Sequence, residues 1–407
     1  MIQAIKAKII VTPGHAPIKD SAVIVKNNII EKIIPSTELK NNYYQIIDLK
    51  NSVVLPGFIN SHIHLELHWV QKLLEPFKSF PSWLNQIIKL KKNFNNSKIP
   101  YWVNKSLNEC INSGVTTIGE ISSYDGLDYK PILDKKIRAV YFYELTNSTL
   151  KNIENKFFQS LIRNKTNPLI NFRIFPHSIY SLDTKSLKRI LAFAKKHNIK
   201  LGMHLSESID EVKYSKRKRN NFEKEVFPKT SYKPTIETKP TTPLEYLDTL
   251  NRNRQHITLI HMNNLSQNDF KILTKKEYPV IICPRSNLYL NQKLPNIKFF
   301  MNYMKTGLGT DGLSSNLSIN FLDEINFLYL NAKKIINNPE EKILSIATIG
   351  GAKALGIDNE VGTIEIGKKA DIIAFDLINK NPYLSIIHSK KRNLKMSMIN
   401  GKIIKLR

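Results

Sequence analysis

The chain of 407 residues has only two cysteines, Cys110 and Cys283, and this scarcity excludes a disulfide-stapled fold. The two residues lie far apart and form no CxxC pair, which fits a reducing compartment. No apolar run approaches the ~18 residues that a membrane span needs. The N-terminal stretch MIQAIKAKIIVTP lacks the long apolar core of a signal peptide. We therefore expect a soluble cytoplasmic protein without a membrane partner.

Acidic residues are also scarce, because 34 Asp and Glu stand against 61 Lys and Arg and leave a formal net charge of +27. Such a surplus is typical of proteins that bind nucleic acids or anionic membranes. The lysines are spread along the whole chain, however, and the dense cluster KRKR at 216–219 lies in a long polar stretch. No RNP, helix-turn-helix or zinc-finger pattern accompanies it. We interpret the charge as a lysine-rich composition and expect no nucleic-acid partner, while a role in attracting an anionic substrate stays open.

Both ends of the chain have the pattern of short β-strands. The first segments, AKIIVT, SAVIVKNNIIEKIIP and YQIIDL, are separated by turn residues, and the chain closes with GTIEIGKKADIIAFDL and MSMINGKIIKLR. The simplest organisation is a small β-sandwich domain built from both termini around a central catalytic domain. We expect residues 1–52 to form its N-terminal part, 53–350 the catalytic domain, and 351–407 a helix-turn and strands that complete the β-domain.

The central part alternates apolar, strand-like runs with helical patterns, which predicts an α/β fold of the (β/α)8 TIM-barrel type. The runs are residues 53–60, 115–121, 137–143, 170–176, 199–204, 256–261, 278–283 and 306–310, and helices are expected at 102–113, 149–163, 183–197, 266–275 and 319–335. One long polar excursion, residues 213–243, follows the fifth run. A loop of that length after a barrel strand is expected to cover the active site as a lid.

Ionisable side chains follow five of these apolar runs, at the carboxyl ends where a barrel gathers its active site. His62 and His64 belong to an H-x-H pair, and strand alternation points both the same way. Each residue alone could equally be a buried histidine with satisfied hydrogen bonds or a loop carboxylate. The coincidence at five strand ends favours a site. Its members are His62, His64, His177, His204, Glu207, His261 and Asp311.

Three imidazoles and a carboxylate suit one divalent ion, zinc above all, with iron tolerated. The expected ligands are His62, His64, His204 and Asp311. Such an ion lowers the pKa of a bound water from ~15.7 to roughly 7. Glu207 is then a candidate general acid and base, and His261 could accept or orient the proton of that water. No lysine ends the fourth run to bridge a second metal, which favours one ion over two.

These motifs together resemble the amidohydrolase superfamily over nearly the full length. The matching segments are PGFINSHIHLE, MHLSES, LIHMNNLS, CPRSNLYL, GTDGLSSNLSINFLDE and GTIEIGKKADIIAFD, joined by the helix-like TPLEYLDTL. They look like the branch that deaminates cytosine, guanine and adenine nucleosides. Within it, HIHLE, CPRSN and TDGLSSN are most similar to the aminodeoxyfutalosine deaminases of menaquinone synthesis. The resemblance implies a hydrolytic deaminase that takes a small-molecule nucleoside and releases ammonia.

The resemblance also implies roles for individual residues. The predicted ligand set stays as above, Glu207 becomes the proton shuttle to the ring nitrogen, and His261 and Asp311 activate the water. His177 implies a contact to the base, although the family often has His-Ala-Pro-Tyr there and this chain has His-Ser-Ile-Tyr at 177–180. Trp83 resembles a tryptophan at the pocket mouth, while an anchoring role in its helix is equally open. Arg285 is a candidate for binding a distal carboxylate, with the 216–219 cluster as second choice.

Several alternatives stay open at the level of sequence. The substrate could be methylthioadenosine, S-adenosylhomocysteine or adenosine, or the chain could be another amidohydrolase of guanine deaminase or chlorohydrolase type. A more remote interpretation is a basic nucleic-acid-binding protein on an inactive scaffold. We interpret His68 as a local contact. The role of Glu66, the metal that is bound in the cell and a homodimeric state are all undetermined.

Overall fold

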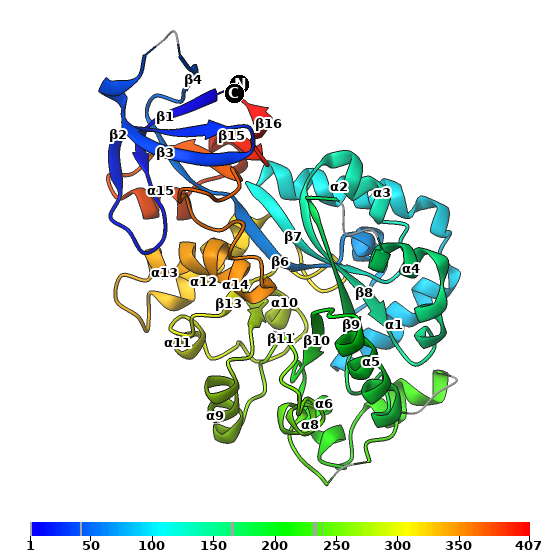
Figure 1. Ribbon diagram of the computed structural model, residues 1–407. Helices are drawn as coiled ribbons and strands as arrows, with labels where there is room; N and C mark the ends of the chain where they lie inside the picture. The colour runs from blue at the N-terminus through cyan, green and yellow to red at the C-terminus, as the bar shows by residue number, and fades with distance from the viewer. Residues whose placement is uncertain (1, 41–42, 164–166, 231–233, 238) are drawn as a thin grey trace.

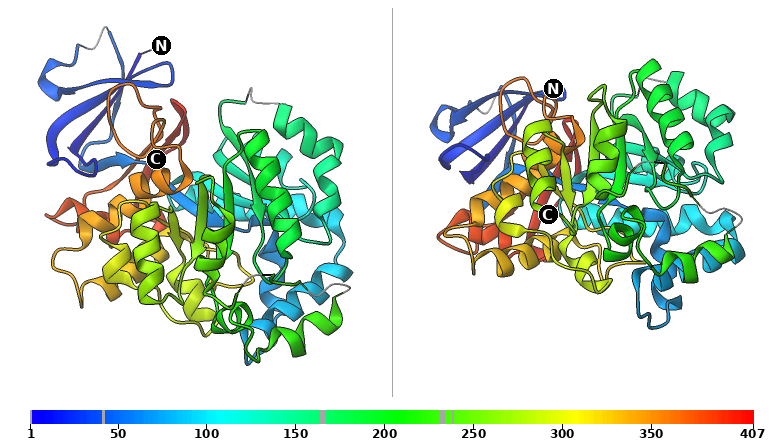
Figure 2. Two further views of the ribbon diagram at one scale, coloured as in Figure 1. Left: turned by 60° about the horizontal axis from the view of Figure 1, so that its bottom comes forward. Right: turned by 90° about the horizontal axis from the view of Figure 1, so that it is seen from below.

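The computed structural model describes residues 2–40, 43–163, 167–230, 234–237 and 239–407, and in it the chain forms two separate sheets (Figure 1). One is an eight-stranded parallel sheet that curls into a barrel, with helices around it. The other is a mixed sheet assembled from both ends of the chain, and it flanks the barrel on one side (Figure 2). Among the described residues, no helix combines the length and apolar character needed to cross a bilayer.

The barrel strands are hydrogen-bonded in chain order, each parallel to the next. They are β6 (Phe58–Ile63), β7 (Val115–Ser122), β8 (Arg138–Leu145), β9 (Ile170–Pro176), β10 (Leu201–Leu205), β11 (Ile257–His261), β12 (Val280–Ile282) and β13 (Thr306–Leu308). The seam between β13 and β6 is closed by individual bonds beyond the end of β13. The Asn60 amide donates to Thr310 Oγ1 at 2.8 Å, and the Asp311 amide donates to the His62 carbonyl at 3.0 Å. The predicted barrel is thus confirmed.

The helices between these strands bury one face against the barrel. They include α2 (Ile99–Asn112), α3 (Tyr129–Lys135), α4 (Lys156–Arg163), α5 (Thr184–Lys196), α8 (Pro243–Leu250), α9 (Gln267–Lys276), α12 (Phe321–Ala332) and α14 (Gly351–Leu355). The interior is filled with side chains such as Ile59, Val140, Phe142 and Phe175. A packed interior leaves the carboxyl ends of the strands as the place for chemistry.

The terminal sheet has the order β16-β15-β14-β5-β1-β2-β3, with β4 paired to β1. Its strands are β1 (Ile2–Ile10), β2 (Ile18–Lys26), β3 (Ile29–Pro35), β4 (Gln45–Asp48), β5 (Ser52–Pro56), β14 (Ile372–Asp376), β15 (Leu394–Ile399) and β16 (Lys402–Leu406). The predicted separate β-unit made from both termini is confirmed, and hydrogen bonds join all of its strands into one sheet.

Two predicted elements differ from the structure. The run 53–60 is divided at Gly57, so that β5 belongs to the terminal sheet and β6 opens the barrel. Side chains of any size are excluded there, because an added Cβ would lie 2.0 Å from Thr116 Oγ1. The predicted helix 149–163 is also divided, into a 3-10 turn (Leu150–Glu154) and α4. Asn155 breaks it, since its side chain accepts the Phe157 amide at 2.8 Å.

A buried ion pair joins the barrel to the terminal sheet. Arg138 in β8 is fully buried, and its Nε and Nη2 contact the two carboxylate oxygens of Asp371 at 2.8 and 3.1 Å. Asp371 directly precedes β14 and also accepts the Asn400 amide at 2.7 Å. The bidentate geometry satisfies both charges in a place that water does not reach.

We expect Asp371→Asn to lower the free energy of unfolding by about 3 kcal/mol, because it removes the bidentate partner of the buried guanidinium and leaves it only one ionic contact, that of Nη1 with Glu360 at 3.3 Å. Denaturant unfolding followed by circular dichroism would measure the loss. Lys130→Gln is a suitable control, because its ion pair with Asp134 is solvent-exposed and contributes little. Equal stability of the two variants would contradict a structural role for the junction.

Candidate active site

The polar side chains expected at the strand ends converge on one point. His62 lies in β6 and His64 directly follows that strand, His204 lies in β10 and His261 in β11, while Asp311 follows β13. In two sets of three, His62/His64/His204 and His62/His261/Asp311, the side-chain ligand atoms all lie within 4.8 Å of one another. The Asp311 carboxylate Oδ1 lies 3.4 Å from His62 Nε2 and 3.7 Å from His64 Nε2.

The imidazoles of this cluster are short of hydrogen bonds. Both ring nitrogens of His62 and the Nδ1 atoms of His64 and His204 are buried and have no partner among the described residues. Burial, helped by the neighbouring histidines, holds the pKa of His64 and of His204 well below the usual range. Neutral rings keep a lone pair available for a cation, so the deficit of partners fits a metal site.

Asp311 is held as a carboxylate in a fixed orientation. Its Oδ2 accepts the Ser286 hydroxyl at 2.7 Å, and its Oδ1 accepts the Gly312 amide at 2.8 Å. Although burial opposes ionisation, the proximity of His62 and His64 holds the pKa of Asp311 well below its usual value. An ionised carboxylate beside neutral imidazoles completes a ligand set of mixed nitrogen and oxygen.

Glu207 and His261 face each other next to this cluster. Glu207 Oε1 lies 3.4 Å from His261 Nε2, and the backbone carbonyl of Glu207 accepts the side-chain amides of Asn263 and Asn264. Burial, with the charges of Asp311 and Glu211, raises the pKa of Glu207 well above the usual range. Burial lowers the pKa of His261 to about 4, and its Nδ1 lies 3.3 Å from Asn287 Oδ1. The pair therefore offers a protonated acid and a neutral base in direct proximity.

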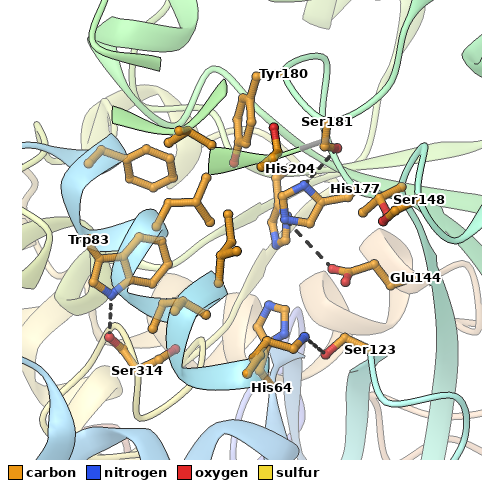
Figure 3. A pocket seen from close by; sticks show the side chains of 18 of the residues that line it. His64, Trp83, Ser123, Glu144, Ser148, His177, Tyr180, Ser181, His204 and Ser314 are labelled. Atoms are coloured by element: carbon orange, nitrogen blue, oxygen red, sulfur yellow. Dashed lines mark hydrogen bonds and ion pairs between the residues drawn. The ribbon is translucent and has the colours of Figure 1, made fainter. Parts of the chain in front are cut away.

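A cavity of about 460 Å³ opens above the cluster, and His64, His204, Glu207, His261 and Asp311 all line it. One wall is apolar and belongs to α1 (Phe80–Asn93), whose residues 80, 83, 84, 87, 88 and 91 repeat at helical spacing. Trp83 of this wall is anchored by Nε1, which donates to the Ser314 carbonyl at 2.8 Å (Figure 3). The stripe ends at Lys91, and Lys92 also lines the cavity.

The opposite wall is polar. Figure 3 shows Ser123, Glu144, Ser148, His177 and Ser181 on this side, across the cavity from Trp83. His177 is held by its Nδ1, which contacts the hydroxyls of Ser178 and Ser181 at 2.9 and 3.1 Å. The predicted base contact therefore lines the cavity with its Nε2 directed away from those serines.

The excursion at 213–243 contributes to the same cavity. Its described part contains the end of α6 (Ile209–Ser215), α7 (Phe222–Glu225) and a 3-10 turn (Phe227–Lys229). Val226, Phe227, Thr230 and Pro234 line the cavity. Residues 231–233 and 238 of the predicted lid lie outside the described residues.

Three residues named in the sequence analysis lie away from the cavity lining. The Arg285 guanidinium contacts the Ser318 carbonyl at 3.1 Å and the Glu324 carboxylate at 3.7 Å. His68 contacts the Ser106 hydroxyl through Nδ1 and stacks on Trp102. Glu66 is buried and accepts hydrogen bonds from the Ser123 amide and hydroxyl and from the Tyr124 amide.

Four other residues at the site were not identified from the sequence. Ser286 and Asn287 contact Asp311 and His261, and Lys91 and Glu144 line the cavity. Ser286 and Asn287 belong to the CPRSN motif, so the motif that indicated Arg285 could also have indicated these two residues. The only indication of Glu144 in the sequence is that it is the one acidic residue of the otherwise apolar segment AVYFYEL.

Comparison with known proteins adds independent information. Over 403 residues, 95% of this chain and 88% of the relative, the sequence is 28% identical to the 5′-deoxyadenosine deaminase of Methanosphaera stadtmanae. The enzyme of the same name from Methanocaldococcus jannaschii is 30% identical, covering 90% of this chain and 84% of the relative.

Solved structures share the fold. Helicobacter pylori aminofutalosine deaminase in complex with methylthio-coformycin has a TM-score of 0.83 at 23% identity, over 98% of this chain and 99% of the other. An adenosine deaminase from Xanthomonas campestris with bound zinc has a TM-score of 0.83 at 20% identity, over 99% and 93%. The profile of the Amidohydrolase family matches residues 53–404. The chain belongs to the amidohydrolase family and is a hydrolase that acts on C–N bonds, as its motifs predict.

Proposed function

We propose that the protein is a metal-dependent deaminase that hydrolyses the amino group of an adenine-type nucleoside and releases ammonia. The observation that carries the proposal is the cluster of Asp311 and imidazoles, four of whose buried nitrogens lack a partner among the described residues, at the floor of a cavity that also holds Glu207 and His261. The names of the relatives, 5′-deoxyadenosine deaminase and aminofutalosine deaminase, support the adenine-type base.

The residues present fit a divalent ion. His62, His64, His204 and Asp311 would hold it, because their ligand atoms are clustered, the rings are uncharged and the carboxylate is ionised. Imidazole nitrogens and one carboxylate favour zinc, and they tolerate iron. Bound there, the ion supplies a water molecule that ionises near neutral pH.

The protein's own side chains then transfer the protons that the reaction requires. His261, neutral and oriented by Asn287, accepts the proton of the attacking water. Glu207 carries the proton that the ring nitrogen next to the amino-substituted carbon must receive, and its raised pKa lets it hold that proton at neutral pH. Ammonia leaves once the ring nitrogen is protonated and the amino group has accepted a proton. The base lies between His177 and Trp83 on opposite walls of the cavity.

The finer proposal for the substrate is aminodeoxyfutalosine, an adenine nucleoside with a carboxyphenyl ketone on its sugar, used in menaquinone synthesis. The apolar stripe on α1 suits an aromatic ring, and it ends in two lysines that suit a carboxylate. Of these, the exposed Lys92 is the better candidate for a distal anion, because the Lys91 ammonium donates to Ser123 Oγ at 2.8 Å. Arg285 is no longer preferred for this role, because its guanidinium is held by Ser318 and Glu324.

The second candidate is 5′-deoxyadenosine. It is favoured by the shared name of several relatives at 27–30% identity over at least 90% of this chain. The distal end of 5′-deoxyadenosine carries no charge, so its binding requires only the apolar wall of the cavity and no cationic side chain. The two candidates share one mechanism and differ at the distal end of the substrate.

A panel of adenine nucleosides tests both levels of the proposal. We expect the purified protein to release ammonia from at least one of aminodeoxyfutalosine, 5′-deoxyadenosine, methylthioadenosine, S-adenosylhomocysteine and adenosine, with the highest kcat/KM for aminodeoxyfutalosine. If another compound exceeded it by more than about tenfold, equal to ~1.4 kcal/mol of transition-state binding, the link to menaquinone synthesis would be wrong and the deaminase would stand. Ammonia from none of them would refute the deaminase itself.

A further inference from the structure

The carboxylate of Glu144 faces the cavity in an unusual state. Strand alternation in β8 turns Val140 and Phe142 into the packed interior of the barrel, while Tyr141 and Tyr143 pack on its outside. Glu144 is the next inward residue, at the carboxyl end of the strand, and its side chain is only 13% exposed. The chain thus places a partly buried acidic side chain in the wall of the active-site cavity.

Glu144 has no hydrogen-bond donor and no lysine or arginine partner among the described residues. The nearest polar group is His177 Nε2, which lies 3.9 Å from Glu144 Oε1 and is therefore beyond hydrogen-bonding distance (Figure 3). By contrast, the buried Glu66 nearby accepts three hydrogen bonds through its two oxygens. A ligand that covers this carboxylate without donating to it would leave it desolvated at a cost, so a ligand bound in this cavity is expected to supply the donors.

The surroundings of Glu144 indicate what that ligand carries. Lys91 lines the same cavity and donates to Ser123, which lies on the Glu144 side in Figure 3. In the part of the wall next to Glu144, its carboxylate and the Lys91 ammonium nearly cancel, so this part favours neither a cationic nor an anionic ligand group. It suits a neutral group that donates and accepts hydrogen bonds at once, and hydroxyls do this.

The geometry points to Glu144 as a substrate-binding residue that accepts hydrogen bonds from the two adjacent hydroxyls of a ribose whose base lies against His177. The two carboxylate oxygens match two neighbouring hydroxyl donors. The hydroxyl oxygens in turn can accept from Lys91. This inference rests on the proposed function and deepens it: ribonucleosides are the preferred substrate class, and 2′-deoxynucleosides are disfavoured.

The experiment compares 5′-deoxyadenosine with 2′,5′-dideoxyadenosine, as substrates or as competitive inhibitors of the best substrate in the panel. We expect the wild-type protein to prefer the ribonucleoside by about 10- to 100-fold, the range for a hydrogen bond to a charged group. The preference should appear mainly in KM or the inhibition constant, because the hydroxyls do not react.

Glu144→Gln and Glu144→Ala should abolish this preference. In both variants the KM or inhibition constant of the ribonucleoside should rise by about the same factor as the lost preference. The constant of the dideoxy compound should change less than about threefold, as in a double-mutant cycle. Glu277→Gln serves as the control, because Glu277 is an exposed carboxylate in an ion pair with Lys305. This variant should leave the KM or inhibition constant of both compounds unchanged.

The outcomes separate the two proposals. Wild-type protein that deaminates adenine nucleosides without any preference for the 2′-hydroxyl would overturn the diol assignment and leave the deaminase intact. The diol assignment is equally overturned if the Glu144 variants impair both compounds to the same extent, because that pattern reports a structural role. Absence of ammonia from every nucleoside in the panel would refute the proposed function, and this inference with it.

Discussion

Replacement of Glu207 by glutamine should lower kcat by about 100- to 10,000-fold, the range for a general acid–base group. Glutamine keeps the shape of the side chain and its place beside His261, but it cannot carry a proton to the ring nitrogen. The backbone of Glu207 is fixed by Asn263, Asn264 and Glu211, so the substitution should leave the fold unchanged. Steady-state kinetics with the best nucleoside of the panel would measure the loss.

The metal content distinguishes loss of the proton carrier from loss of the site. We expect the Glu207→Gln protein to bind as much divalent ion as the wild type and to unfold at the same temperature. A variant that kept more than a tenth of the wild-type kcat would show that the proton travels by another route. A variant that lost its metal would instead assign Glu207 to the ligand set.

The positions of the ligand candidates could be predicted because two regular geometries coincide. Alternation along β6, continued to His64 directly after it, puts His62 and His64 on one side, and a parallel barrel brings the ends of β10, β11 and β13 to the same face. Their convergence therefore needs no knowledge of side-chain packing. The same reasoning could not find the break at Gly57, because the apolar run continues through it and the division depends on the close approach of Thr116.

Side chains whose direction depends on a single helical turn, or on where a strand ends, were harder to predict. In α10 (Pro284–Tyr289), successive residues are rotated by about 100°, so Ser286 and Asn287 face Asp311 and His261 while Arg285 turns to Glu324. The sequence shows the motif but not the direction of each side chain. Glu144 was missed for a similar reason: the predicted strand stopped at residue 143, one residue before the carboxylate that lines the cavity.

Removal of the divalent ion should abolish turnover and also destabilise the protein. The buried nitrogens of His62, His64 and His204 have no alternative partner among the described residues, so their lone pairs stay unsatisfied once the ion has left. Because the ion binds the folded chain and not the unfolded one, saturation at about 1,000 times its dissociation constant adds ~4 kcal/mol of stability. We therefore expect the chelated protein to unfold at a clearly lower temperature.

Elemental analysis of protein purified without chelator should find one divalent ion per chain. Dialysis against a chelator should remove it, with a parallel fall in kcat and in the unfolding temperature, and added zinc should restore both. The Glu207→Gln protein is the matched control, because it lacks turnover but should show the same shift in unfolding temperature. Two ions per chain would contradict the single-ion site. Full activity of metal-free protein would mean that the imidazole cluster is structural, and the hydrolytic water would then have to be activated by His261 and Glu207 alone.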